Sequence, residues 1–342
     1  MSTQIPSSAL TIGIDIGGTK ILGGVVDSTG KVIDSARRAT PAAGGMALVA
    51  TVIELIKEFA QKHEVAGVGI SIAALISSDS GRIFDAPNIA NLSEINFVNE
   101  IEKEIKLPVI AENDANAAMW AEYKFGNAKG FNPVILFIIG TGMGGGLVID
   151  GKLFRGANGI GAEFGHMIVQ PQGVMCGCGI QGCIEQYASG SALMRYAKEG
   201  IEADLEKAKN LLELSGGNIS GLTGTILTNA ARSGDELAIA AFNKQADWFG
   251  SACASSYSLL LDPQAIVLGG GVVGAGELFL EPARKAMQSY MPFGKSHPLP
   301  VIIAAKFGND AGLIGASDLV REARSIFKVI FCSCCSPDYG CN

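Results

Sequence analysis

The sequence predicts an α/β protein built from two related halves, and three observations lead to that prediction. Apolar strands end in glycine-rich turns, several strands are followed by segments with helical periodicity, and one strand–turn–strand pattern occurs twice. Strands that alternate with helices along a chain are typical of the α/β class. The 342 residues are 48% hydrophobic and 17% charged, which suffices for two packed lobes and excludes a disordered or collagen-like chain.

The first half is expected to open with a β-meander. The segments LTIGIDIGG, ILGGVVD and GKVID follow one another from Leu10 as apolar strands separated by turns rich in glycine and aspartate. Residues 46–63 then place apolar side chains on one face at helical spacing, and residues 65–72 form a further buried strand. Residues 108–111 are expected to form a short strand that leads into a helix beginning near Asp114.

The second half repeats this pattern. The segment FIIGTGMGGGLVIDGK echoes IDIGGTKILGGVVDSTGK, and a unit repeated about one domain apart indicates two related lobes. Residues 189–209 and 222–261 are expected to be mainly helical, with strands at 265–271 and 301–305. We predict a small lobe of residues 1–114 with 306–330, a large lobe of residues 115–305, and a cysteine-rich tail at 331–342.

Composition and charge limit the classes of partner. The net charge of −7 and the pI near 5.1 offer no basic face for nucleic acid or for an anionic membrane. No run approaches the roughly 20 apolar residues that cross a bilayer, and the N-terminus lacks the features of a signal peptide. We therefore expect a cytoplasmic protein that binds neither nucleic acid nor membrane.

Two glycine-rich loops are candidates for phosphate binding. Each follows an apolar strand and contains a threonine, and their glycines allow backbone N–H groups to approach phosphate oxygens. Taken singly, each loop could be an ordinary tight hairpin, but the matching pair favours a nucleotide, with Mg²⁺ near Asp15. The residues predicted to bind the nucleotide are Asp15, Gly17, Gly18, Thr19, Lys20, Gly140, Thr141, Gly142, Gly144, Gly269, Gly270 and Gly271.

A histidine and three cysteines form a candidate metal site. His166, Cys176, Cys178 and Cys183 give the spacing H-x₉-C-x-C-x₄-C, and one imidazole with three thiolates makes a closed tetrahedral set for structural Zn²⁺. Cys176 and Cys178 are too close in sequence for an easy disulfide. The alternative is three free thiols in a glycine-rich turn, but clustered cysteines in a cytosolic chain favour a metal.

These motifs resemble a known family. DIGGTK, GTGMGGG and LGGGV look like the phosphate and adenosine motifs of the actin-like ATPase superfamily. The segment GAEFGHMIV with CGCGIQGCIEQYASG is similar to the signature of the ROK family of sugar kinases and repressors, and the resemblance covers about residues 10 to 325. It implies a duplicated actin-like (ribonuclease H-like) fold of two lobes with a cleft between them. It also implies ATP-dependent phosphorylation of a hexose at its 6-hydroxyl, with glucose as the first candidate.

The resemblance implies roles for individual residues. Asp114 becomes the catalytic base, although the sequence alone would make it or Asn113 a helix N-cap. We expect the N-terminus of that helix to keep Asp114 ionised. His166 would hold zinc through one ring nitrogen and a sugar hydroxyl through the other. The implied sugar-binding residues are Asn88, Asn113, Asp114, Glu163, His166 and Glu185, with surface charges as the alternative for the two glutamates.

Other readings and partners remain open at this point. N-acetylmannosamine, mannose or fructose could replace glucose, whereas polyphosphate as donor fits poorly because such relatives generally lack the zinc cysteines. A repressor would need a basic helix-turn-helix, and only about ten residues precede the first strand. A non-catalytic sugar sensor would be expected to lack the base or the loops. We expect Mg²⁺ with ATP, structural Zn²⁺ and a homo-oligomer, either a dimer or a tetramer.

The chain departs from the family pattern at two residues and in its cysteine-rich tail. The family often has glycine where this chain has Ala74, and many members have tryptophan where it has Asn91. The alanine could preserve a backbone contact with the sugar, whereas the absence of tryptophan bears on sugar preference and not on the chemistry. The tail resembles nothing in the family, and we expect a flexible segment with reactive thiols in preference to a second metal site. Its cysteines are Cys332, Cys334, Cys335 and Cys341.

Overall fold

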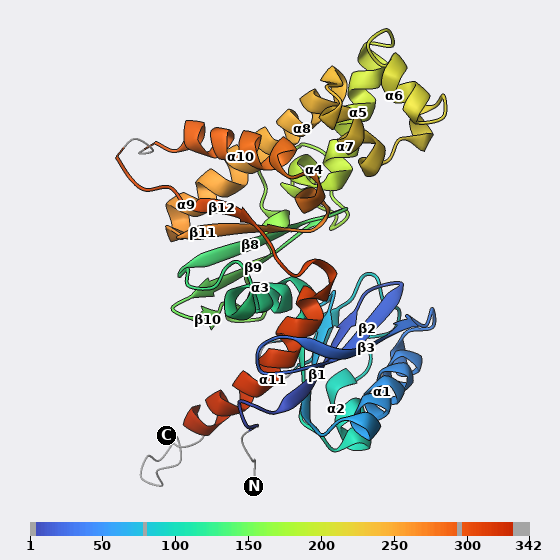
Figure 1. Cartoon of the computed structure of the whole chain (residues 1–342), viewed down its shortest axis with the longest axis vertical. Helices are drawn as coiled ribbons and strands as arrows, with labels where there is room; N and C mark the ends of the chain where they lie inside the picture. Colours follow the sequence, from blue (N-terminus) through green and yellow to red (C-terminus); the bar gives the residue numbers. More distant parts are fainter. Residues whose placement is uncertain (1–4, 78–80, 293–295, 331–342) are drawn as a thin grey trace. The chain divides into compact units, whose positions relative to one another are not determined.

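The computed structural model describes residues 5–77, 81–292 and 296–330, with side chains described as far as residue 322 (Figure 1). The chain divides into two compact units. The first unit comprises Met1–Gly126, Arg155–Gly161 and Asn309–Asn342, and the second comprises Asn127–Phe154 and Ala162–Gly308. Each unit contains a five-stranded sheet with helices packed on it, which confirms the α/β prediction. The cysteine-rich tail lies outside the described residues.

The sheet of the first unit begins with the predicted meander. Its strand order is β3-β2-β1-β4-β7, with the first three strands antiparallel and the last two added in parallel. The strands are β1 (Leu10–Ile16), β2 (Lys20–Val26), β3 (Val32–Ala39), β4 (Val65–Ile72) and β7 (Val109–Asn113). A separate small ribbon pairs β5 (Leu75–Ile76) with β6 (Ile83–Asp85).

Helices cover both faces of this sheet. Neighbouring residues of a strand point to opposite faces. An added Cβ on Gly23 would meet Leu55 of α1 (Gly45–Lys62), and one on Gly24 would meet Leu313 of α11 (Ala311–Ile330). On the α11 face the approach is so close that a Cβ on Gly69 would lie 1.7 Å from the Ala316 carbonyl oxygen. The glycines of these strands therefore let α11 pack directly on the sheet.

Two further helices complete the first unit. α2 (Phe97–Ile105) packs on α1 and β7, and α3 (Asp114–Phe125) packs along α11. α3 begins at Asp114, directly after β7, as the sequence predicted. The apolar cluster between the sheet and α1 contains fully buried isoleucines from alternate positions of β1, namely Ile12, Ile14 and Ile16.

The sheet of the second unit repeats the topology of the first. Its order is β10-β9-β8-β11-β12, again an antiparallel meander followed by two parallel strands. The strands are β8 (Val134–Ile139), β9 (Met143–Ile149), β10 (Lys152–Leu153), β11 (Ala265–Gly269) and β12 (Val301–Ala304). The internal repeat seen in the sequence is therefore a repeat of the whole sheet.

The helices of the second unit are shorter and more interrupted than expected. Residues 189–209 break after Ala203, and residues 222–261 contain a turn between α7 and α8 and a π-helix at Phe249–Ser255. The helices are α4 (Glu185–Ala188), α5 (Gly190–Ala203), α6 (Lys209–Leu214), α7 (Gly224–Arg232), α8 (Glu236–Trp248), α9 (Ser256–Leu261) and α10 (Glu277–Tyr290). Short 3₁₀ turns lie at Phe164–His166, Ile219–Gly221 and Gly271–Ala275, with another at Gly308–Asp310 where the chain passes from the second unit to the first.

An aromatic cluster supports the turn at Phe164–His166. Phe164 packs against Phe137 of β8 and against Tyr257, with ring centroids 5.1 and 4.5 Å apart. Phe249, from the π-helix, meets Phe137 edge-on at 5.3 Å. Such contacts fix large rings in place, so the turn packs on a rigid group of aromatic side chains. A search of the described helices finds no segment long and apolar enough to cross a bilayer.

Candidate functional site

The loop between β1 and β2 presents the first glycine motif. Gly17 N–H donates to the Lys20 carbonyl oxygen at 2.9 Å, and Thr40 Oγ1 donates to the Gly17 carbonyl oxygen at 2.7 Å. Gly18 and the two residues after it are exposed. A Cβ on Gly18 would lie 3.1 Å from the carbonyl oxygen of Asn88, so the loop and Asn88 are neighbours. The loop is thus fixed at its base and accessible at its tip.

Beside this loop lies a group of carboxylates. Asp15 is in β1, and its Oδ1 accepts a hydrogen bond from Ser71 Oγ at 2.6 Å. Burial raises the pKa of Asp15 to about 6, the Ser71 hydrogen bond acts against this rise, and the charges of Asp114 and Asp310 add to it. Lys20 opposes them. Asp310 directly precedes α11. The sequence analysis missed it because nothing in the sequence placed it beside Asp15.

Asp114 lies at the start of α3 in a tightly bonded turn. Its Oδ1 accepts from the Ala115 N–H at 2.9 Å, and Asn113 is the N-cap, with its Oδ1 accepting from the N–H groups of Ala115 and Asn116. Asn113 Nδ2 donates to the Ala74 carbonyl oxygen at 3.3 Å. Asn113 therefore does cap the helix, the role that the sequence alone suggested.

The surroundings of Asp114 change its acidity. Burial raises the pKa of this carboxyl, and the hydrogen bond from the Ala115 N–H offsets only part of that rise. The helix N-terminus therefore does not keep the group as acidic as an ordinary aspartate. A raised pKa brings a carboxylate closer to the range that suits proton transfer near neutral pH.

The loop between β8 and β9 presents the second glycine motif, and α5 holds it. Gly190 N–H donates to the Gly140 carbonyl oxygen at 2.7 Å, and Ser191 Oγ donates to the Thr141 carbonyl oxygen at 2.8 Å. Gln245 Nε2, from α8, donates to the carbonyl oxygens of the two residues just before Gly190. The loop is therefore bonded to the start of α5, which is in turn bonded to α8.

A cavity of about 590 Å³ opens beside this loop. This volume is within the usual range for small-molecule sites, and a nucleotide is of that size. Gly140, Thr141 and Gly271, which are three of the predicted nucleotide-binding residues, line it. Gly142, Gly144, Gly269 and Gly270 do not line it. Gly270 instead makes the turn after β11, where its φ of 81° and the Ile139 carbonyl oxygen 2.5 Å from an added Cβ both favour glycine.

One wall of the cavity comes from α7, which the sequence analysis missed. Thr225, Thr228, Asn229 and Arg232 all line it, and Arg232 donates to the Gly274 carbonyl oxygen at 2.7 Å. Their spacing of i, i+3, i+4 and i+7 places them on one face of a helix. A polar stripe at helical spacing in an otherwise apolar helical region was the signal that could have revealed this wall.

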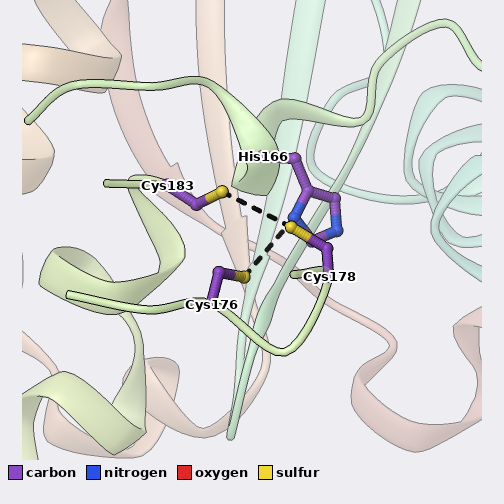
Figure 2. Close-up of side chains that lie close together, drawn as sticks. All are labelled: His166, Cys176, Cys178 and Cys183. Atoms are coloured by element: carbon purple, nitrogen blue, oxygen red, sulfur yellow. Dashed lines mark hydrogen bonds between the residues drawn. The ribbon is translucent and has the colours of Figure 1, made fainter. Parts of the chain in front are cut away.

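The predicted metal ligands lie together in the second unit (Figure 2). The ligand atoms of His166, Cys176, Cys178 and Cys183 are all within 4.8 Å of one another. Cys176 Sγ is 3.8 Å from His166 Nδ1, and Cys178 Sγ is 3.6 Å from Cys183 Sγ. Tetrahedral zinc with bonds of about 2.3 Å separates its ligand atoms by about 3.8 Å. The four residues therefore fit Zn²⁺, and the sulfurs are too far apart for a disulfide.

Two details of this cluster bear on its chemistry. Burial raises the pKa of Cys176 and raises that of Cys183 to about 12, whereas hydrogen bonding by the Ile180 N–H lowers that of Cys178. A bound divalent cation would favour thiolates at these positions. His166 turns Nδ1 toward the sulfurs, so its Nε2 is on the far side of the ring, and the residue as a whole is exposed.

Glu185 connects the cluster of four candidate metal ligands, called the metal cluster below, to the second glycine loop. Its Oε2 accepts from the Met143 N–H at 2.9 Å, and its Oε1 lies 3.5 Å from Cys176 Sγ. Glu185 is half-buried, so the alternative of a free surface charge is wrong for this residue. Glu163 is also half-buried and directly precedes the turn that carries His166. Asn88, Asn113 and Asp114 lie in the first unit, while Glu163, His166 and Glu185 lie in the second.

Comparison with known proteins identifies the class. The model of the ROK family matches residues 11–323, so the chain belongs to the ROK family. A glucokinase from Streptomyces coelicolor is 44% identical over 313 residues, which cover 92% of this chain and 98% of that protein. A glucokinase from Thermotoga maritima is 33% identical, with 91% and 97% of the two chains covered.

Solved structures agree with this assignment. A crystal structure of a ROK family glucokinase from Streptomyces griseus, in complex with glucose and AMPPNP, superposes with a TM-score of 0.79. It is 43% identical, and the match covers 92% of this chain and 99% of that one. The predicted family resemblance and the duplicated fold are therefore confirmed.

Proposed function

We propose that this protein is a glucokinase, which transfers the γ-phosphoryl group of ATP to the 6-hydroxyl of glucose. The observation that carries the proposal is the half-buried Asp114 carboxyl at the start of α3, within electrostatic range of Asp15 at the first glycine loop. A base beside a phosphate loop is what a kinase requires. The similarity to glucokinases over nearly the whole chain supports glucose as the acceptor.

The nucleotide is assigned to two sets of residues. The cavity beside Thr141 and α7 suits the base and ribose, since its volume is large enough for them and it is lined by both apolar and polar groups. The exposed backbone of residues 17–19 and that of Gly140–Gly142 suit the phosphates. Mg²⁺ bound to ATP would supply charge neutralisation at the phosphates, and Asp15 is the residue proposed to orient it through water.

Asp114 is proposed to act as the base. As the sugar O6 forms its bond to the γ-phosphorus, the bond from that phosphorus to the bridging oxygen breaks and ADP leaves. The O6 proton passes to the Asp114 carboxylate. Because burial raises the pKa of Asp114, we expect kcat to fall on acidification at a higher pH than for an ordinary aspartate. Asn88 and Asn113 are the proposed partners of neighbouring sugar hydroxyls.

The metal cluster is proposed to orient the sugar-binding side chains of the second unit. With Nδ1 committed to the sulfur cluster, His166 can donate from Nε2 to a sugar hydroxyl. Glu163, on the same turn, and Glu185, bonded to Met143, are the proposed acceptors of hydroxyl hydrogens. Zn²⁺ would have a structural role here. A homo-oligomeric state and a cytoplasmic location belong to the same proposal.

The test is an assay of ADP release with glucose, mannose, fructose and N-acetylmannosamine, using the wild type and Asp114→Asn. We expect the highest kcat/KM with glucose. The variant should lose about 10²- to 10⁴-fold in kcat, as is typical when a general base is removed, and should still bind glucose by calorimetry. Near-normal turnover by Asp114→Asn would contradict the assigned base. A higher kcat/KM for another hexose would change the substrate and leave the chemistry in place.

A further inference from the structure

Glu112 is a buried carboxylate to which the proposed mechanism gives no role. It is the fourth residue of β7, directly before Asn113 and Asp114, and only 7% of it is exposed. Its Oε1 accepts from the Asn113 N–H and from Asn116 Nδ2, both at 3.1 Å. Glu112 therefore bonds to both ends of the turn that presents Asp114.

The charge of Glu112 is balanced from a distant part of the sequence. Its Oε2 accepts from Arg155 Nε at 2.6 Å, and the Arg155 side chain is 30% exposed. A short charge-assisted hydrogen bond of this kind is stronger than one between neutral groups. An unpaired carboxylate at such a buried position would be strongly disfavoured. Arg155 is thus the charged partner of Glu112 beneath the turn.

Arg155 begins a short segment with an unusual path. Arg155–Gly161 belongs to the first unit, although the residues on either side of it in the chain belong to the second. The segment closes on itself, since Gly161 N–H donates to the Arg155 carbonyl oxygen at 2.9 Å. A Cβ on Gly161 would lie 2.7 Å from the Arg155 carbonyl carbon, so only glycine allows this closure. Two residues later the chain reaches Glu163.

We propose that Glu112 and Arg155 are a positioning pair for the phosphoryl-transfer site. Through Oε1, Glu112 fixes the turn that carries Asp114. Through Oε2, it anchors the segment whose end leads directly to Glu163 and His166. One ion pair thereby fixes the turn that carries the base and the segment that leads to the sugar-binding turn. The inference rests on the proposed function of Asp114 and Glu163, and it adds two residues that touch neither substrate.

A second ion pair, which is buried on both sides, lies in the same unit and supplies a control. Arg321 Nη1 is 3.0 Å from Asp318 Oδ1, with 6% and 8% of the two side chains exposed. Arg321 also donates to the carbonyl oxygens of Ala9 and Val26, and Trp120 donates to Asp318. This network joins α11 to α3 and to the start and end of the first β-hairpin. Its hydrogen bond to α3 is made by Trp120, six residues after Asp114, so breaking the network should affect stability alone.

The experiment compares Glu112→Gln, Arg155→Gln and Arg155→Lys with Asp318→Asn, each assayed below the onset of its melting transition. For Glu112→Gln and Arg155→Gln we expect kcat to fall about tenfold or more and the glucose KM to rise about tenfold. The ATP KM should stay within about twofold, because neither Glu112 nor Arg155 lines the nucleotide cavity. Arg155→Lys should recover part of the loss. Asp318→Asn should lower the melting temperature and leave all three kinetic constants within about twofold.

Two results would overturn the pair. One is unchanged kcat and glucose KM in Arg155→Gln, and the other is an equal kinetic loss in Asp318→Asn. Should Arg155→Gln fail to fold, Arg155→Lys decides, since unchanged glucose affinity there is equally contrary. Glucose binding by calorimetry keeps the two proposals separate. If Asp114→Asn turns over normally, the proposal that Asp114 is the base is wrong, and Arg155→Gln can still be found to weaken glucose binding. If Arg155→Gln binds glucose normally and Asp114→Asn is inactive, only the proposal of the positioning pair is wrong.

Discussion

The two sheets share one topology and differ in what they hold. Each begins with an antiparallel meander, adds two parallel strands and carries a three-residue glycine loop after its first strand. The loops follow Ile16 in one sheet and Ile139 in the other. The residue before Ile16 is Asp15, whereas the residue before Ile139 is Ile138. The same strand position thus holds an acid in one unit and an apolar side chain in the other.

This difference shows how a duplicated scaffold can be divided between tasks. The loop of the first unit lies beside the Asp15, Asp114 and Asp310 carboxylates, and burial disfavours the ionised forms of Asp15 and Asp114. The loop of the second unit lies beside a cavity and, through Glu185, beside the metal cluster. The fold supplies two equivalent loops, and the side chains around each determine its chemistry. The predictions below test that division.

Removing the metal should have the largest effect on the second unit. We expect Cys178→Ser to lose about one equivalent of zinc and to weaken glucose binding about 10- to 100-fold, because His166 and Glu185 would no longer be oriented. Elemental analysis and calorimetry measure the two quantities. Cys253→Ala is the control, since Cys253 is buried in the π-helix away from the cluster. Full metal content and normal glucose binding in Cys178→Ser would contradict the role given to the cluster.

Adding a methyl group should distinguish positions within one loop. A Cβ on Gly142 would lie 2.4 Å from Glu185 Oε2, whereas one on Gly140 would meet nothing within 4 Å. Gly142→Ala should therefore break the bond between Glu185 and Met143 and lower the free energy of unfolding by about 2 kcal/mol. Gly140→Ala should change it by less than about 0.5 kcal/mol. Chemical denaturation measures both, and equal values would mean that Glu185 does not brace the loop.

Neutralising Asp15 should make the first unit more stable while impairing catalysis. The folded-state pKa of about 6 lies above the ordinary aspartate value of 3.8, so the contribution of Asp15 to stability is present below pH 3.8 and is lost as pH rises through 6. The Asp15→Asn side chain stays neutral as pH rises, so this variant does not lose that stability. We expect a gain of about 1–2 kcal/mol at pH 8 that vanishes near pH 4. Denaturation without nucleotide at both pH values checks this, and a destabilised variant at pH 8 would contradict the assigned burial effect.

The sequence predicted most of the framework because its local signals agree with the final packing. The meanders, α1, β4 and the start of α3 at Asp114 were visible as apolar periodicity and turn chemistry. The metal cluster was predictable because four ligands close in sequence must also be close in space. The repeat of the glycine loops indicated the duplicated sheets. In each case the signal was local or was repeated.

What the sequence did not predict depends on contacts between distant segments. Asp310 beside Asp15 and Arg155 beside Glu112 join residues far apart in the chain, and no spacing rule brings them together. The polar face of α7 was readable as a helical stripe, but its place on the cavity wall depends on how α7 packs in the second unit. The pKa of Asp114 likewise depends on burial that a helix N-terminus alone does not reveal.

The division of labour between the units is tested most directly by calorimetric titration of an ATP analogue and glucose into two variants, with turnover measured alongside. Asp114→Asn should bind both ligands within about twofold of the wild type and lose about 10²- to 10⁴-fold in kcat. Thr228→Trp, which fills part of the cavity in the second unit, should weaken binding of the analogue about tenfold or more and leave glucose binding unchanged. Loss of nucleotide binding in Asp114→Asn, or normal nucleotide binding in Thr228→Trp, would contradict the account.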